Sequence, residues 1–230
     1  MRVGLIVPSS NTVMEPDFHR RLGNIAIVST TRIFLEDVTR DAETRMLEQD
    51  LPRAIDLIRT TAPDIVVFGC TSAGALGNSA HDQAIAGQIA AGTGAVAITV
   101  LASLLASIRA VAPRRLALFT PYVDDLTGAI ASSLKEAGFP PVKAAGMGIR
   151  SNLEIGRVPP PEIIRFVESQ LAGCAPDCLF LSCTNWQAID AIEPLEQKLG
   201  VPILTSNQAA IRAVIERRQH TREFSQRHSG

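Results

Sequence analysis

The sequence predicts an α/β fold with two pseudo-symmetric lobes, each a parallel sheet flanked by helices, and an active site in the cleft between them. Three observations predict this class. Short apolar runs alternate with helix-length amphipathic stretches, aliphatic residues dominate while aromatic residues make up only 4% of the chain, and a set of motifs recurs at one spacing. A chain of 230 residues has room for a core in each lobe.

The apolar runs define eight expected strands, four in each half. We expect them at 3–7, 25–27, 65–68 and 96–98 in the first half, and at 116–119, 142–145, 178–181 and 202–204 in the second. Amphipathic helical patterns lie between them, for example at 43–60 and at 161–171, and the second pattern opens with a proline run of the kind that helix starts tolerate. Strands that alternate with helices pair in parallel through right-handed crossovers.

The recurring motifs are in register between the two halves. Two prolines, two Ala-Pro-Asp triplets and two Cys-Thr pairs are each separated by 113 residues. They are Pro8 and Pro121, residues 62–64 and 175–177, and residues 70–71 and 183–184. We therefore expect a first lobe over 1–112, whose last helix is free to cross over, a second lobe over 113–217, and a polar, basic C-terminal tail over 218–230.

Each Cys-Thr pair follows an expected strand, which places Cys70 and Cys183 at the carboxyl ends of the two sheets, where open α/β sheets bind ligands. If the lobes face each other, the thiols flank one cleft and can act as nucleophile and as proton donor or acceptor. Both turns are expected to open a helix. Its N–H groups would lower the thiol pKa and, with the hydroxyl groups of Thr71, Ser72 and Thr184, bind the carboxylates of a small acid.

The turns that follow the first strand of each lobe differ in sequence. PSSNT, residues 8–12, offers Asn11, and PYVDD, residues 121–125, offers Tyr122; both side chains can hydrogen-bond a carboxylate. Each also has a purely structural interpretation. Asn11 can cap a helix that begins near Val13, and Tyr122 can serve as a packing residue.

Composition and missing motifs exclude several classes of function. A formal net charge of -1 gives no electrostatic footprint for nucleic acid or an anionic membrane, and the N-terminal apolar run is too short for a signal peptide. We expect a cytoplasmic protein with free thiols. Cys174 and Cys178 lack two further ligands at metal-binding spacing, and no dinucleotide or phosphate-binding glycine motif is present, so neither a metal nor a cofactor is expected.

Five stretches resemble the maleate cis-trans isomerases of the aspartate/glutamate racemase superfamily, whose two-lobed, cofactor-independent enzymes carry a cysteine at each strand mouth. The stretches are LIVPSSNTVMEPDF, FGCTSAGAL, TPYVDDL, SNLEIGRVPP and LSCTNWQAID, spread over residues 5–190. The chain departs from the family where Ala73-Gly74-Ala75 follows the first Cys-Thr-Ser. A more Gly/Ser-rich continuation is expected there, so the shape of the pocket and the identity of the diacid are in question.

The resemblance implies a mechanism. Cys70, as thiolate, adds to an alkene carbon of maleate and Cys183 protonates its neighbour; the resulting succinyl-cysteine rotates about a single bond and eliminates fumarate. The resemblance also implies which residues hold the substrate carboxylates. The side chains are those of Asn11, Tyr122 and Asn152, and the backbone contribution comes from around Thr71, Ser72, Val123, Thr184 and Asn185. The expected partners are a small dicarboxylate and further copies of the chain, as a homodimer or homotetramer.

Three alternatives remain open. An amino-acid racemase also uses two thiols but needs a group to receive an ammonium ion, and no acidic residue lies at either Cys-Thr turn. An arylmalonate decarboxylase-like enzyme would keep Cys183 and carry a small residue such as glycine in place of Cys70. The non-enzyme alternative is a cytosolic binding protein for small acids, in which paired reactive thiols would be a liability.

Overall fold

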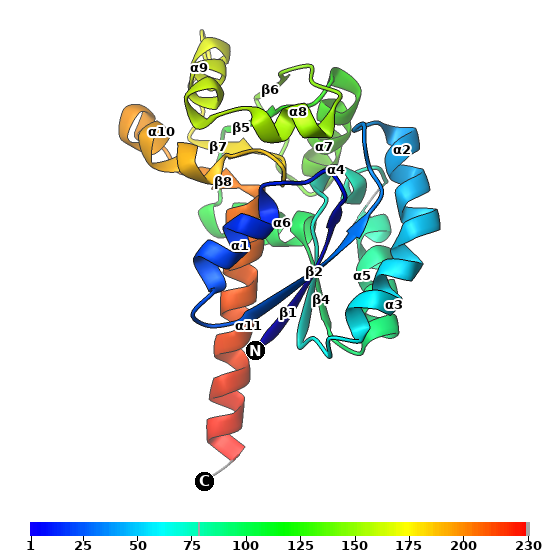
Figure 1. Cartoon of the computed structure of the whole chain (residues 1–230). Coiled ribbons are helices and arrows are strands. Elements are labelled where there is room, and N and C mark those ends of the chain that lie inside the picture. Colours follow the sequence, from blue (N-terminus) through cyan, green and yellow to red (C-terminus); the bar gives the residue numbers. More distant parts are fainter. Residues whose placement is uncertain (78, 229–230) are drawn as a thin grey trace.

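The computed structural model of the chain describes residues 1–77 and 79–228, which form two four-stranded parallel sheets flanked by helices (Figure 1). The strand order is β2-β1-β3-β4 in the first sheet and β6-β5-β7-β8 in the second, so the two sheets have the same order and the predicted duplication is confirmed. The strands are β1 (Arg2–Pro8), β2 (Ile27–Ile33), β3 (Ile65–Phe68), β4 (Val96–Thr99), β5 (Leu116–Thr120), β6 (Lys143–Gly146), β7 (Cys178–Leu181) and β8 (Ile203–Thr205).

The helices fill the connections between the strands. In the first half they are α1 (Met14–Leu22), α2 (Arg40–Arg45), the π-helical turn η1 (Met46–Asp50), α3 (Leu51–Arg59), α4 (Thr71–Gly74), α5 (Ser79–Thr93) and α6 (Val100–Val111). In the second half they are α7 (Asp124–Glu136), α8 (Asn152–Arg157), α9 (Pro160–Gln170), the 3-10 turn η2 (Ile189–Ala191), α10 (Ile192–Leu199) and α11 (Ser206–His228). None of the described helices is long and apolar enough to cross a membrane.

The strand predictions hold to within a residue or two, with one exception. β3 and β7 have the predicted bounds, and both are buried along their whole length, as expected of central strands with both faces covered. The strand expected at 25–27 instead begins at Ile27 and runs to Ile33. β2 is one of the two edge strands of its sheet and carries Ser, Thr and Arg, so it lacks the continuous apolar run that predicts the other strands.

The single helix expected over 43–60 is divided into α2, η1 and α3. Pro52 explains the division, because a proline inside a helix has no N–H to donate and its ring clashes with the carbonyl group of the preceding turn. The π-helical turn Met46–Asp50 absorbs this defect immediately before Pro52. Glu43 therefore lies on the short first segment, which packs against α4.

The repeated Ala-Pro-Asp triplets have a structural role. The Asp64 carboxylate accepts the N–H of Arg2 at 2.7 Å, and the Asp177 carboxylate accepts the N–H of Arg115 at 2.9 Å, in each case beside the start of the first strand of a lobe. Each aspartate also donates its own N–H to the carbonyl oxygen of the same arginine, at 2.9 and 3.0 Å. The triplet thus fixes the register in which β3 and β7 start beside β1 and β5.

The last helix connects the two halves. α11 follows β8 but runs along the first lobe, where it packs against α6 and α1 (Figure 1). Asn207, near its start, donates to the carboxylate of Asp17 on α1 at 2.8 Å and to the carbonyl oxygen of Thr184 at 3.0 Å. The segment expected as a polar tail from residue 218 is helical through His228; residues 229 and 230 lie outside the described residues.

Candidate active site

The two repeated cysteines occupy equivalent positions at the carboxyl ends of the central strands. Cys70 follows β3 and is the N-cap residue of α4, and Cys183 follows β7. Both side chains are buried, at 5% and 3% exposure. They belong to one continuous core cluster that extends through both lobes and also contains Tyr122. The predicted placement of the two thiols at the strand mouths agrees with the structure.

The two Cys-Thr turns differ in local structure, and one expectation about them is wrong. The first opens a short helix, as predicted, and the amide of Ala73 hydrogen-bonds the Cys70 sulfur. The second does not open an α-helix. The N–H of Asn185 donates to Cys183 Sγ at 3.2 Å, and the amide of Trp186 also bonds this sulfur.

Burial controls the acidity of both thiols and raises both pKa values, so the expectation that the turns lower the thiol pKa is wrong. The pKa of Cys183 is raised to about 12 by burial, and the hydrogen bonds from the Tyr122 hydroxyl and from the amides of Asn185 and Trp186 oppose this shift. The pKa of Cys70 is raised well above its ordinary value by burial and then by the charge of Glu43, with a further contribution from Cys183. The pKa of Tyr122 is raised by burial and by both cysteines. These mutual effects place the three side chains in one small space.

A network of buried asparagines joins the lobes beside the thiols. Asn11 donates from Nδ2 to Thr184 Oγ1 at 3.0 Å, and Thr184 Oγ1 donates to the carbonyl oxygen of Gly69 at 2.9 Å. The other side of Asn11 accepts the backbone N–H groups of Val13 and Met14, both at 3.0 Å. Asn11 therefore caps the start of α1, as one interpretation held, and also reaches across to the turn of Cys183.

Asn185 and Asn152 extend the same network. Asn185 accepts the N–H of Thr12 at 2.8 Å through Oδ1, and its Nδ2 donates to the carbonyl oxygen of Asn152 at 2.5 Å and to its Oδ1 at 3.2 Å. Asn152 Nδ2 in turn donates to Ser10 Oγ at 2.9 Å. The structure brings the predicted Asn11, Asn152 and Asn185 into one connected set between the lobes.

The remaining predicted residues are less uniform in their roles. Ser72 Oγ lies 3.7 Å from Cys70 Sγ. Thr71 Oγ1, by contrast, donates to Ser206 Oγ at 2.9 Å, so its hydroxyl group fixes the first Cys-Thr turn to the start of α11. Val123 is the half-buried N-cap residue of α7 and follows Tyr122 directly.

Glu43 is a buried acidic residue of this cluster that the sequence reasoning missed. Its side chain is fully buried, and Oε1 accepts a hydrogen bond from Ser72 Oγ and lies 3.7 Å from Cys70 Sγ. Burial raises the pKa of Glu43 to about 7, against the opposing effects of Ser72, Cys70 and Arg40. The premise that no acidic residue lies at either Cys-Thr turn holds along the sequence but fails in space.

Comparison with known proteins now identifies the family. Residues 3–228 match the family model described as arylmalonate decarboxylase. The chain belongs to the arylmalonate decarboxylase and maleate isomerase family. Enzymes of this family use cysteine catalysis, and the two buried thiols are in keeping with that chemistry.

Proteins similar to this chain include maleate isomerases and an arylmalonate decarboxylase. The chain is 25% identical to a maleate isomerase of Geobacillus stearothermophilus over 94% of this chain and 90% of the relative. It is 27% identical to an arylmalonate decarboxylase of Bordetella bronchiseptica over 90% and 86%. A solved variant of the Nocardia farcinica maleate cis-trans isomerase, with a covalently bound succinylcysteine intermediate, is 25% identical, covers 94% of this chain and 91% of its own, and has a TM-score of 0.85.

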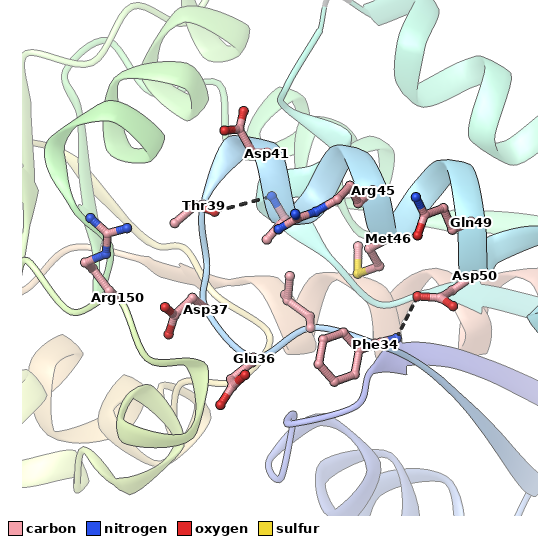
Figure 2. A pocket seen from close by; sticks show the side chains of 12 residues that line it. Phe34, Glu36, Asp37, Thr39, Asp41, Arg45, Met46, Gln49, Asp50 and Arg150 are labelled. Carbon is pink, nitrogen blue, oxygen red and sulfur yellow. Dashed lines mark hydrogen bonds between the residues drawn. The ribbon is translucent and has the colours of Figure 1, made fainter.

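The structure also has a surface cavity whose lining contains neither of the two repeated cysteines. It has a volume of about 600 Å³ and lies between the 34–39 segment, α2, η1 and Arg150 (Figure 2). Phe34 is exposed on it, and the Phe34 N–H donates to the Asp50 carboxylate at 3.2 Å. Glu43 does not line it either, so this cavity is distinct from the cluster of the two thiols, Tyr122 and Glu43.

Proposed function

We propose that this enzyme isomerises maleate to fumarate without a cofactor, through a covalent succinyl-cysteine intermediate. The observation that carries the proposal is the pairing of two buried thiols, Cys70 and Cys183, at the strand mouths of the two lobes, close enough for Cys183 to raise the pKa of Cys70. A decarboxylase of the kind weighed above would carry a small residue in place of Cys70. The presence of both thiols therefore favours isomerisation over decarboxylation.

The two thiols divide the chemistry between them. The Cys70 sulfur, once it has lost its proton, forms a bond to one alkene carbon as a thiolate, and the alkene electron pair takes the proton of the Cys183 thiol onto the neighbouring carbon. The bond between these carbons is then single and rotates. The Cys183 thiolate removes the proton, the bond to the Cys70 sulfur breaks, and fumarate leaves with both residues in their starting states.

The polar groups around the thiols suit a carboxylate. Asn11 and Asn152 each use their –NH2 group in one hydrogen bond to another residue, and an –NH2 group carries two donors. One N–H of each therefore remains for a substrate oxygen. The Tyr122 hydroxyl, hydrogen-bonded with Cys183, and the backbone around Thr71, Ser72, Val123, Thr184 and Asn185 complete the proposed carboxylate contacts.

Glu43 supports a second candidate from the same superfamily. A carboxylate in contact with Cys70 is a group that an α-ammonium ion can pair with, so an amino-acid racemase satisfies the geometry as well. The first candidate is preferred because four of the five curated relatives are maleate isomerases and the fifth is a decarboxylase.

Proton NMR in D2O separates these candidates in one experiment. Reduced protein is incubated separately with maleate, with phenylmalonate and with single L-amino acids, and the products are read from their spectra. We expect fumarate from maleate and no change in the other samples. Loss of the α-proton signal from an amino acid, with maleate unchanged, would support racemisation instead. Phenylacetate formed from phenylmalonate would support decarboxylation, and either result would overturn the proposed isomerisation.

A further inference from the structure

Glu43 is a buried acid whose position the repeated architecture does not explain. It comes from α2, whereas both cysteines come from the turns after central strands. Arg40, on the same helix, is the cation that acts on it, but the Arg40 side chain donates to the carbonyl oxygen of Leu76 at 3.0 Å and lies 3.8 Å from the Asp125 carboxylate. Among the described residues, no lysine or arginine forms an ion pair with Glu43.

The two oxygens of the Glu43 carboxyl group have different surroundings. Oε1 accepts the Ser72 hydroxyl and lies 3.7 Å from the Cys70 sulfur, within reach of a thiol hydrogen bond. Oε2 is buried and has no hydrogen-bond partner in the part of the chain that the structure describes. An unpaired acceptor in the interior is costly, so a proton on this group relieves an unfavourable arrangement.

We propose that Glu43 is the base that accepts the Cys70 proton when the sulfur attacks the substrate. The inference rests on the proposed function, because it takes Cys70 as the nucleophile. The S–H bond of Cys70 breaks and its proton moves to the Glu43 carboxylate, while the sulfur electron pair forms the bond to carbon. On elimination the sulfur recovers that electron pair and Glu43 returns the proton. No other reactant is needed.

The surroundings of Cys70 create the need for such a base. A nucleophilic thiol usually has a cation or an extended helix N-terminus beside it. Here α4 is only four residues long, and the groups that favour the Cys70 thiolate are the Ala73 amide and the Ser72 hydroxyl. Burial opposes ionisation more strongly than these groups favour it. Transfer to an adjacent carboxylate avoids an isolated buried thiolate before attack.

The charged and titratable groups that face Glu43 come from four elements. They are Arg40 on its own helix, Cys70 after β3, Tyr122 after β5 and Cys183 after β7. The two thiols and the tyrosine are neutral at neutral pH because their pKa values are raised, so they do not compete for the proton. The pKa of Glu43, raised by burial to about 7, suits a base that works near neutral pH.

The pH dependence of Cys70 alkylation tests the inference without any substrate. Iodoacetamide is applied from pH 5.5 to 9.5, and the Cys70 peptide is quantified by mass spectrometry. In the wild-type protein we expect the rate to rise through an inflection near pH 7, as Glu43 loses its own proton and becomes able to accept one. In Glu43→Gln the inflection should vanish, and the rate should rise only toward the pKa of the thiol itself.

Two variants separate a proton-accepting role from a structural one. Glutamine keeps the size of the side chain and an oxygen for Ser72, so a structural role predicts that Glu43→Gln retains the wild-type profile. Glu43→Asp keeps a carboxylate and should retain an inflection. If Glu43→Gln does not fold, the wild-type and Glu43→Asp profiles still test the inference, because it requires an inflection in both. An inflection that survives in Glu43→Gln, or one that is missing from the wild type, overturns the inference.

Measuring turnover distinguishes a failure of this inference from a failure of the proposed function. With maleate as substrate, Glu43→Gln should lower kcat/KM by roughly 100-fold or more, the size expected for loss of a general base. If maleate is not converted but the alkylation inflection is present, the proposed function fails and the base assignment stands. If maleate is converted equally well by wild type and Glu43→Gln, the base assignment fails and the proposed function stands.

Discussion

The side chain of Asn185, from the second lobe, accepts the backbone N–H of Thr12, from the first lobe, at 2.8 Å. The same side chain holds Asn152 through two further bonds, so one residue next to Cys183 joins both walls of the proposed cleft. A second connection lies nearby, where Val38 and Arg150 pair through their backbones at 2.8 Å beside the bridge between Asp37 and Ser151. The lobes are therefore tied together at the site by specific polar bonds in addition to the shared core.

Loss of the Asn185 side chain should weaken both stability and turnover. In Asn185→Ala, the buried Asn152 loses two hydrogen bonds and the N–H of Thr12 loses its partner, and an unsatisfied buried group costs about 1–3 kcal/mol. We expect urea denaturation to show a loss of about 2 kcal/mol or more in unfolding free energy. Gln197→Ala is the matched control, because Gln197 makes an exposed bond to Glu193 and its loss should change stability by under about 0.5 kcal/mol. Equal stability of the two variants would contradict this role for Asn185.

Mutation should separate Cys70 and Cys183, which the mechanism uses, from Cys174, which it does not use. Cys70→Ser and Cys183→Ser should each reduce maleate turnover by roughly 1,000-fold or more, because serine is a far weaker nucleophile and acid than a thiol. Cys174→Ser should leave turnover unchanged, since Cys174 is half-buried and precedes β7, at the end of the strand remote from the site. Turnover is followed by the appearance of fumarate, and circular dichroism confirms folding. Substantial activity in Cys70→Ser or Cys183→Ser would refute the two-thiol mechanism.

The sequence predicted those parts of the molecule that depend on local pattern. Central strands such as β3 and β7 are short buried runs, and the repeats placed Cys70 and Cys183 at equivalent strand ends. The full extent of β2 and the non-helical turn after Cys183 were not predicted, because β2 carries polar residues and because the second Cys-Thr pair has the same local pattern as the first, which does open a helix. Which residues meet across the lobes depends on tertiary packing, and no local pattern encodes it.

Glu43 illustrates a signal that was present but not used. It lies three residues before Met46, and both face the core together with Leu51, Ala54 and Ile58 along the same helical run. A lone carboxylate on the apolar face of an expected amphipathic helix breaks the pattern. Buried acids are rare unless they are paired or functional, so this break pointed to a site residue.

The stability of the protein should depend on pH because of the buried Glu43. Because the pKa of Glu43 is raised from 4.5 to about 7 in the folded state, the folded chain holds this proton more tightly than the unfolded chain. The resulting stabilisation is fully present below pH 4.5 and is lost as the pH rises through 7. At about 1.4 kcal/mol for each unit of pKa difference, the loss between pH 4.5 and 8 amounts to about 3 kcal/mol.

In Glu43→Gln, residue 43 does not titrate. As the pH is raised from 5 to 8, the unfolding free energy of this variant should therefore increase relative to that of the wild type by about 3 kcal/mol. Asp17 and Asp82 also have raised pKa values caused by burial, but both proteins contain them and their effects cancel in the difference. Urea denaturation of both proteins at several pH values measures this difference in unfolding free energy. A difference that stays constant with pH would show that Glu43 ionises equally in the folded and unfolded chain, and would remove the physical basis for its role as a base at neutral pH.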